Sequence, residues 1–474
     1  MKNKIVSNFI YQLAYQLTLI LLPIISIPIV SKSLGVEGIG TYNFITSVVS
    51  YFILISGLGL ANYGIREIAV VKNDKKKLSE KFWTLELFNI IVASIVLIFY
   101  LLFIYILKLN VFFLISGISL IATLFDISWF YYGIEDFKQI TTINIIVKIL
   151  SFICIVLFIK QSDDLIIYFF IQCISILFSN ISLWFYLRKK IHWVAPKFHK
   201  AMNHLKPALN YFVGKASITI YTTLNKTLLG LLASNVAVGL YTNSLQLTTI
   251  FITIIGTIDS VLLPHMTNLY SMNKEDEMLK LMENAINIQL FFSIPIMFGL
   301  ILINTQFIPW FFGIEFNYLE YTVPVLSPLV IIIPLGTSIV RQYLIPLNHI
   351  KQFNISVGVA AIIGLIVNLL LIPFIGIWGA IIATLISELV VTGIRLVDLK
   401  KKTSFRFKRN DILVYFFSSI IMFFIVKIVT MNFEAKITTT FIQGGLGIII
   451  YIGITSLLRK GPIIDYITQR RKNV

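Results

Sequence analysis

Long apolar runs separated by short polar segments make up most of the chain. Each run is about 18 to 24 residues long, the length at which a helix crosses roughly 30 Å of hydrocarbon. The pattern predicts fourteen membrane-spanning helices, at residues 9–30, 41–63, 84–107, 111–132, 143–159, 165–187, 207–232, 239–263, 284–303, 324–345, 354–373, 379–397, 412–431 and 437–458. We therefore expect an all-α polytopic membrane protein.

The composition excludes a soluble enzyme. Of the 474 residues, 57% are hydrophobic and only 13% are charged, whereas soluble domains carry roughly 25% charged residues. The apolar stretch at residues 9–30 is too long for a signal-peptide core, and no small-residue cleavage site follows it, so we expect it to remain as the first span. Cys154 and Cys173 lie inside predicted spans, and their number and spacing indicate neither a disulfide framework nor a metal site. We expect no bound cofactor.

The distribution of basic residues orients the predicted spans. Lys and Arg number 39 against 22 Asp and Glu, a net charge of +17, which in a soluble protein would suggest a nucleic-acid partner. With the N-terminus in the cytoplasm, 30 of these 39 bases fall on the cytoplasmic side and only four fall outside: Lys32, Lys108, Lys160 and Lys436. The asymmetry predicts an even number of helices and two cytoplasmic termini. We therefore expect the lipid bilayer, and not nucleic acid, to be the partner of the basic residues.

A weak internal repeat divides the chain. Gly40-Thr41-Tyr42 follows the first predicted helix and Gly239-Leu240-Tyr241 follows the seventh, at an offset of 199 residues. Two like-oriented halves are typical of parallel-repeat transporters, whose substrate path lies between the halves. We expect a six-helix lobe at residues 1–187, a basic cytoplasmic linker at 188–206, a second six-helix lobe at 207–397, and two further helices with a basic tail at 398–474.

Arg395 lies at the cytoplasmic end of the twelfth span and is counted with the loop that follows it; apart from Arg395, nine charged residues fall within the predicted spans. A charge at mid-bilayer costs about 2.5–3.5 kcal/mol, so these side chains need a protein interior or water. Five of them lie near helix ends, where they can snorkel to the interface: Glu86, Lys148, Asp259, Arg341 and Lys427. The other four are deeper, and we expect them to be functional: Asp126, Lys215, Lys226 and Glu388.

The seventh predicted helix carries a polar stripe. Its members recur at helical spacing within an arc of roughly 120°: Tyr211, Lys215, Thr219, Thr222, Asn225 and Lys226. Under the repeat offset, Gln12 and Gln16 of the first helix occupy the positions of Tyr211 and Lys215. Such a stripe is expected beside a water-filled cavity, where ammonium groups attract an anion such as phosphate. The alternative is a polar seam between helices, closed by hydrogen bonds.

Several short segments resemble one known family. They are Gly35–Tyr42, Gly57–Leu60, Gly64–Ala69, Trp129–Lys138, Asn225–Gly230 and the pair Leu263-Pro264. They resemble segments of bacterial polysaccharide repeat-unit flippases, the Wzx-type transporters of the MATE-like flippase and exporter superfamily. The similarity covers nearly the whole chain and is strongest in the first 270 residues.

This resemblance implies fourteen helices in two lobes around a central cavity. It also implies that the protein moves an undecaprenyl-diphosphate-linked oligosaccharide to the outer leaflet of the bacterial cytoplasmic membrane, for capsule, O-antigen or exopolysaccharide synthesis. A polysaccharide polymerase and other assembly proteins are expected partners. Many relatives have Asp where this chain has Asn225, so any ion-coupling role of that acid is not carried over, and Lys226 lacks that adjacent counter-charge.

We therefore expect a cationic cavity that works by alternating access. Lys215 and Lys226, helped by Arg66, Lys148 and Arg341, are the candidate diphosphate ligands. Tyr211, Asn225, Gln12 and Gln16 are expected to line the same cavity. Asp126 and Glu388 are candidates for proton or sodium coupling, because a buried carboxylate can be tuned to titrate near neutral pH. The alternative is that each acid pairs with a cavity base.

Two other functions fit less of the pattern. A cation-coupled multidrug exporter would share the fold, but it predicts an acidic cavity rather than a basic stripe. A membrane glycosyltransferase or polysaccharide polymerase predicts a sizeable external loop with carboxylates or arginines. The external segments around Glu315 and Glu320 are short.

Overall fold

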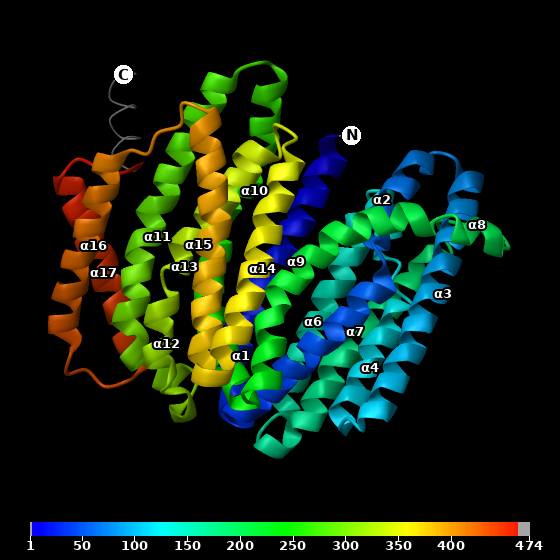
Figure 1. The fold of residues 1–474 in the computed structure, drawn as a ribbon, viewed down its shortest axis with the longest axis horizontal. Coiled ribbons are helices and arrows are strands. Elements are labelled where there is room, and N and C mark those ends of the chain that lie inside the picture. The colour runs from blue at the N-terminus through cyan, green and yellow to red at the C-terminus, as the bar shows by residue number, and fades with distance from the viewer. Residues whose placement is uncertain (1, 463–474) are drawn as a thin grey trace. The chain divides into compact units, whose positions relative to one another are not determined.

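The protein is built from helices in a computed structural model, which describes the backbone of residues 2–462 and the side chains at 11, 14–19 and 21–462 (Figure 1). The first helices are α1 (Lys2–Gly57), α2 (Leu60–Val71), α3 (Lys75–Leu107), α4 (Val111–Thr123), α5 (Ser128–Gly133), α6 (Phe137–Phe158), α7 (Leu165–Leu187), α8 (Phe198–Met202) and α9 (Leu205–Leu232). The remainder are α10 (Asn235–Ser271), α11 (Glu275–Phe311), α12 (Leu319–Leu326), α13 (Leu329–Ile339), α14 (Ile350–Ile375), α15 (Ile377–Lys402), α16 (Arg409–Thr430) and α17 (Ile437–Leu457). Residues 2–462 contain no strand, so the predicted all-α class is confirmed.

Twelve helical segments of the described chain are long and apolar enough to cross a membrane. The first two predicted spans fall within a single segment, Ala14–Val71, and each of the other eleven segments corresponds to one further predicted span. The remaining predicted span is α9, which is helical but too polar to belong to this set. The chain is therefore a multi-pass membrane protein, and the number of fourteen crossings stays a prediction.

The hydrophobic pattern did not predict correctly where some helices continue and where others break. The first predicted span and most of the second, up to Gly57, are joined in α1, which has non-helical dihedral angles at Gly35, where φ is 67°. The end of the second span crosses the turn at Leu58–Gly59 into α2. The single helix predicted at 111–132 is wrong, because the structure splits it into α4 and α5 at a non-helical segment around Asp126. Apolar residues continue across this segment, so hydrophobicity alone did not reveal the break.

The chain forms two compact units, Met1–Gly230 (unit 1) and Leu231–Val474 (unit 2). Helix α9 packs with unit 1, where Thr227 and Gly230 contact α1. The lobe boundaries predicted from the repeat stay a prediction. The two repeat tyrosines do make corresponding contacts: the Tyr42 ring packs 4.8 Å from the Tyr168 ring on α7, and Tyr241 Oη lies 2.7 Å from Thr384 Oγ1 on α15. In the predicted repeat, α7 and α15 are the sixth helices of their halves.

Each unit has an aromatic core. In unit 1, the Phe82 ring stacks on Trp129 at 5.4 Å, and the buried Tyr131 hydroxyl donates to the carbonyl of Leu183 at 2.6 Å. In unit 2, the Tyr451 hydroxyl donates to the carbonyl of Phe291 at 2.8 Å. Large apolar side chains also cover the outside of the helices, as expected for surfaces that contact lipid.

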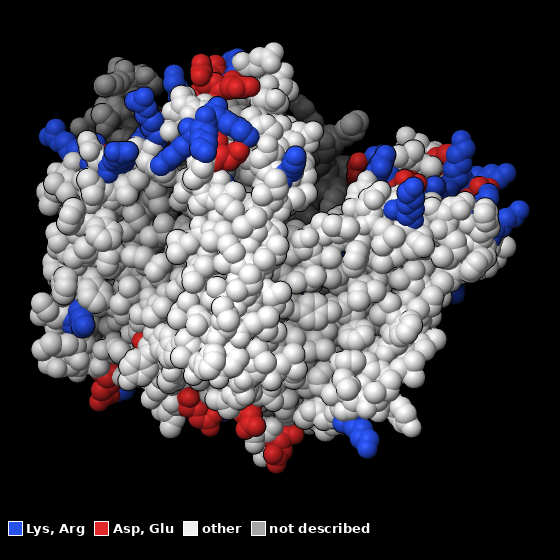
Figure 2. All heavy atoms as spheres, viewed as in Figure 1, with Lys and Arg blue, Asp and Glu red and all other residues white. Residues whose placement is uncertain are grey.

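Figure 2 shows how charge is distributed over each unit. The basic side chains of unit 1 gather over the α2–α3 connection and α8, and those of unit 2 gather over the α15–α16 connection. Along the middle of the helices this face is almost free of charge. On this face, charge is thus concentrated at the helix ends, as expected beside a membrane. The cytoplasmic location of the termini stays a prediction.

Candidate functional site

Helix α9 is fixed to unit 1 at both of its ends. Near its start, Tyr211 Oη accepts a hydrogen bond from Arg66 Nη1 of α2 at 3.2 Å. Near its end, Thr227 Oγ1 lies 2.8 Å from Ser47 Oγ and 3.2 Å from Tyr51 Oη, both on α1. These contacts hold the polar stripe in place between two anchors.

Close backbone approach accounts for two of the glycines that anchor α9. Gly59, in the left-handed conformation at φ 76°, would place a Cβ 2.4 Å from the carbonyl oxygen of Ala208. Gly230 lies against the Phe44 ring, where a Cβ would be 2.1 Å from a ring carbon. Both glycines belong to segments that carried the family resemblance.

The two lysines of the stripe lie between the anchors. Lys215 is exposed and Lys226 is half-buried, and neither forms an ion pair with a carboxylate among the described side chains. Eleven residues separate them, which places both on one face and roughly 16 Å apart along the axis. The nearby hydroxyl of Thr222 bonds to carbonyls of its own helix rather than to another helix. Both ammonium groups therefore remain available to an anion.

The other predicted diphosphate and cavity residues are more dispersed. Arg66 is joined to Tyr211, as described above. Lys148 is exposed on α6 and Gln16 is exposed on α1, whereas the side chain of Gln12 lies outside the described residues. Arg341 lies in unit 2, on a π-helical turn (Val340–Leu344), and donates to Ser260 Oγ. Within unit 1, the structure thus brings together Arg66 and Tyr211.

The predicted coupling acids lie in different surroundings. Glu388 is half-buried on α15. Asp126 is half-buried in the break between α4 and α5, where its Oδ1 accepts the backbone N–H of Ser128 at 3.0 Å. This local bond pairs the first backbone N–H of α5 with the side chain two residues earlier, a structural role that the sequence interpretation did not include.

Two acids that we expected to snorkel are instead buried, so that prediction is wrong. Glu86 and Asp259 both have zero exposure. Asp259 Oδ1 accepts three hydrogen bonds from other helical elements of unit 2: from Gln289 Nε2 at 2.9 Å, Ser338 Oγ at 2.9 Å and Gln342 Nε2 at 2.6 Å. These donors supply protein partners to Oδ1, whereas Oδ2 is buried with no hydrogen-bond partner among the described residues.

Arg395, which we expected at the cytoplasmic end of the twelfth predicted span and counted with the loop after it, is a buried base. Helix α15 continues beyond it, and the side chain is only 8% exposed. Its Nε donates to Ser356 Oγ at 3.0 Å and its Nη1 donates to the carbonyl of Gly336 at 3.2 Å. Its position near the end of an apolar run concealed this role.

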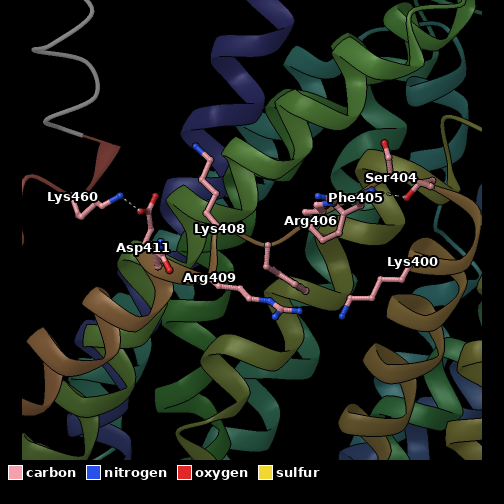
Figure 3. Close-up of a pocket in the computed structure, with 11 residues that line it drawn as sticks. Lys400, Ser404, Phe405, Arg406, Lys408, Arg409, Asp411 and Lys460 are labelled. Atoms are coloured by element: carbon pink, nitrogen blue, oxygen red, sulfur yellow. Dashed lines mark hydrogen bonds and ion pairs between the residues drawn. The ribbon is translucent and has the colours of Figure 1, made fainter.

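A basic pocket of about 930 Å³ opens at the α15–α16 connection (Figure 3). Figure 3 shows the charged ends of Lys400 and Arg409 pointing toward one another. Lys460 pairs with Asp411 at 2.8 Å, but Lys400 and Arg409 form no ion pair among the described side chains. The pocket is a second place where an anion would be favourable, beside the membrane surface.

An apolar pocket of about 430 Å³ lies among four helices of unit 2. Its lining comes from α10, α11, α16 and α17 and includes Phe251, Pro295, Met422, Gly447 and Tyr451. A surface of this kind suits an acyl or isoprenoid chain rather than a sugar.

Comparisons with known sequences agree with the resemblance. The family described as polysaccharide biosynthesis protein matches residues 5–270. A protein of Escherichia coli (strain K12) named as an O-antigen transporter is 22% identical over 409 residues, covering 83% of this chain and 96% of its own length. A protein of Haloferax volcanii named as a low-salt glycan biosynthesis flippase is 25% identical over 248 residues, 50% of each chain.

Solved structures with the same fold are transporters. The lipid II flippase MurJ in an inward closed conformation matches with a TM-score of 0.76 and 17% identity, over 95% of this chain and 98% of that one. An inward-facing multidrug resistance MATE family transporter matches with a TM-score of 0.61 and 14% identity, over 81% of this chain and 96% of that one. The fold is therefore MATE-like. Because the family match spans more than half of the sequence, the chain belongs to the polysaccharide biosynthesis protein family.

Proposed function

We propose that this protein is a flippase for oligosaccharides linked to polyprenyl diphosphate, moving them from the cytoplasmic to the outer leaflet of the bacterial cytoplasmic membrane. The observation that carries the proposal is the stripe on α9, where Lys215 and Lys226 lack carboxylate partners among the described side chains. A diphosphate cannot be buried without compensating charge, and two ammonium groups supply it. Relatives named as O-antigen transporter and glycan flippase support the same cargo.

The remaining parts of the cargo need different surroundings. A hydrated path suits the sugars, because the polar stripe exposes hydroxyl and amide groups along α9. The apolar pocket of unit 2 is a suitable place for part of the isoprenoid chain. The mechanism that we propose is alternating access, with the stripe exposed to one leaflet and then to the other.

A cellular export assay tests this function. A strain that lacks its own repeat-unit flippase is complemented with this protein and with matching glycan synthesis, and surface polysaccharide is measured. The double variant Lys215→Ala/Lys226→Ala is expected to lose export, because each charge-assisted contact contributes about 1.5–3 kcal/mol, roughly tenfold or more in binding.

The basic pocket of unit 2 provides a matched control. Lys400→Ala/Arg409→Ala removes the same two units of charge from the α15–α16 connection. We expect this variant to export at the wild-type level. Equal loss in both double variants would show that export depends on overall charge and would contradict a diphosphate site on α9.

A further inference from the structure

The break between α4 and α5 is held by side chains from two other helices of unit 1, α3 and α7, and from α5 itself. Four consecutive or nearly consecutive carbonyls each accept a hydrogen bond from a side-chain N–H. The pairs are Asn180 Nδ2 with Ala122 O (2.8 Å), Asn89 Nδ2 with Thr123 O (3.0 Å), Trp184 Nε1 with Phe125 O (2.9 Å) and Trp129 Nε1 with Asp126 O (2.9 Å). Unwound backbone within a membrane protein requires such partners. Specific side chains of unit 1 therefore stabilise the non-helical backbone of the break.

Glu86 lies beside this break. It precedes Asn89 by three residues on α3, so both side chains project from the same face, and Asn89 holds the carbonyl of Thr123. Glu86 has zero exposure, and neither of its carboxyl oxygens has a hydrogen-bond partner in the part of the chain that the structure describes. An ionised carboxylate in that position would be very costly, so the group carries a proton in this conformation.

The charged groups around Glu86 reinforce this assignment. Asp126, the acidic residue of the break, is a carboxylate rather than a cation, and its Oδ1 accepts the backbone N–H of Ser128. On α2, Glu67 Oε2 forms an ion pair with Lys81 Nζ of α3 at 2.9 Å, and Arg66 donates a hydrogen bond to Tyr211.

The other elements packed against α3 offer no compensating cation. The stretch 38–57 of α1 contains no charged residue, and neither do α4 and α5. On α8, His199 and Lys200 are exposed. No described base therefore pairs with Glu86.

We infer that Glu86 is a proton-binding site of the transport cycle, releasing its proton when the α4–α5 break rearranges and exposes the carboxyl group to water. The step is the simple equilibrium between a carboxylic acid and a carboxylate plus a proton. Broken membrane helices are frequent places for such coupling sites because two rigid halves can move about the unwound segment. This inference rests on the proposed function, since it assigns a driving ion to the same transporter.

The donor set favours a proton over a metal cation. The four carbonyls of the break already accept side-chain hydrogen bonds, so they do not form an open ring of oxygen ligands. The described residues also contain no group of three or more His, Cys, Asp or Glu side chains able to hold a metal ion. A single buried carboxyl group needs only a proton to become neutral.

Infrared titration of the purified protein in lipid nanodiscs tests whether Glu86 is protonated. The carbonyl stretch of a protonated carboxyl group is measured near neutral pH for the wild type, Glu86→Gln and Glu80→Gln. Glu80 is an exposed glutamate on the same helix, so its variant is the matched control. We expect one component of the signal to disappear in Glu86→Gln alone. An unchanged signal in Glu86→Gln would overturn the inference.

Transport into proteoliposomes tests the coupling itself, with a polyprenyl-diphosphate-linked glycan as the probe and with or without an imposed pH gradient. The wild type and Glu86→Asp are expected to respond to the gradient, whereas Glu86→Gln is expected to transport at one rate in both conditions. A gradient response retained in Glu86→Gln would refute coupling through this residue while leaving the flippase function standing. If the wild type moves no glycolipid at all, the proposed function and its coupling fail together, and the infrared result still decides whether Glu86 holds a proton.

Discussion

The hydroxyl oxygens of Ser47 on α1 and Thr227 on α9 lie 2.8 Å apart, in a buried hydrogen bond between residues 180 positions apart in the sequence. This bond fixes the end of α9 one residue beyond Lys226. Because the adjacent lysine is only half-buried, the anchor holds a cation near the protein surface without neutralising it. The positions of the two lysines therefore depend on uncharged contacts at the ends of the helix.

Removing the hydroxyl of Thr227 should destabilise the protein. Thr227→Val removes the hydrogen bond between α9 and the Ser47 hydroxyl, which keeps its bond to the carbonyl of Phe44, at a cost of about 0.5–1.5 kcal/mol. The midpoint of thermal unfolding in detergent is expected to fall. Thr222→Val is the control, because Thr222 is exposed and bonds only to its own helix. An equal effect of the two substitutions would contradict the anchoring role of Thr227.

Two glycines of α9 should respond in opposite ways to alanine. Gly230→Ala would force a Cβ to 2.1 Å from the Phe44 ring, and such overpacking costs about 1–3 kcal/mol. Gly214→Ala meets nothing within 4 Å and should be neutral or stabilising by up to about 1 kcal/mol, through helix propensity. Thermal unfolding of the two variants is the measurement. A stable Gly230→Ala protein would show that α9 does not pack closely on α1.

The buried Asp259 should be required for the stability of unit 2. Asp259→Ala leaves the side-chain amides of Gln289 and Gln342 without their shared acceptor, and each unsatisfied donor costs about 1–3 kcal/mol, whereas the Ser338 hydroxyl can still donate to Gln289 Oε1. We expect poor accumulation in membranes and a lowered unfolding midpoint. Asp163→Ala, on an exposed connection, is the control and should behave like the wild type. Normal stability of Asp259→Ala would indicate that water reaches this site.

The loop before α9 should make stability depend on pH. Partial burial, with a further contribution from the nearby Lys81, lowers the pKa of His204 below 6.5, although Glu67 opposes this shift. The neutral ring lies with its Nδ1 2.5 Å from Tyr63 Oη. The unfolded chain then binds a proton more readily than the folded protein, so this contribution to stability is present above the unfolded pKa and is lost as the pH falls through the folded pKa.

Unfolding midpoints measured from about pH 7.5 down to about pH 5 test this sign. The wild type is expected to lose stability toward acid, and His204→Gln is expected to lose less over the same interval. His199→Gln, an exposed histidine of α8, should retain the wild-type slope. A slope that is identical in all three proteins would exclude His204 as its source.

The helices could largely be predicted from the sequence because hydrophobic length is a direct requirement of the bilayer. Most residues of every predicted span lie in helical structure, but three spans cross a helix break: 41–63 at Leu58–Gly59, 111–132 around Asp126, and 324–345 at Ser327–Pro328. The break around Asp126 depends on long-range donors such as Asn180 and Trp184, which no local pattern identifies. The continuation of α1 past Gly35 was missed for the opposite reason, since polar residues there suggested a loop.

The polar stripe was identifiable because helical periodicity places its members on one face. The burial of Glu86 and Asp259 was not identifiable, because it depends on which residues of other helices surround them. Gln289 and Gln342 were visible as polar residues in apolar runs, and that signal could have indicated a buried partner. Only the fold showed that both amides donate to the same carboxylate.

The most direct test of the central claim is flipping by the purified protein. Proteoliposomes containing a labelled polyprenyl-diphosphate-linked glycan are made with the wild type, with Lys215→Ala/Lys226→Ala and with Lys400→Ala/Arg409→Ala, and transfer of the label between leaflets is followed. The account predicts transfer by the wild type and by the Lys400/Arg409 variant, and little transfer by the Lys215/Lys226 variant. Transfer at the wild-type rate after removal of both α9 lysines would contradict it.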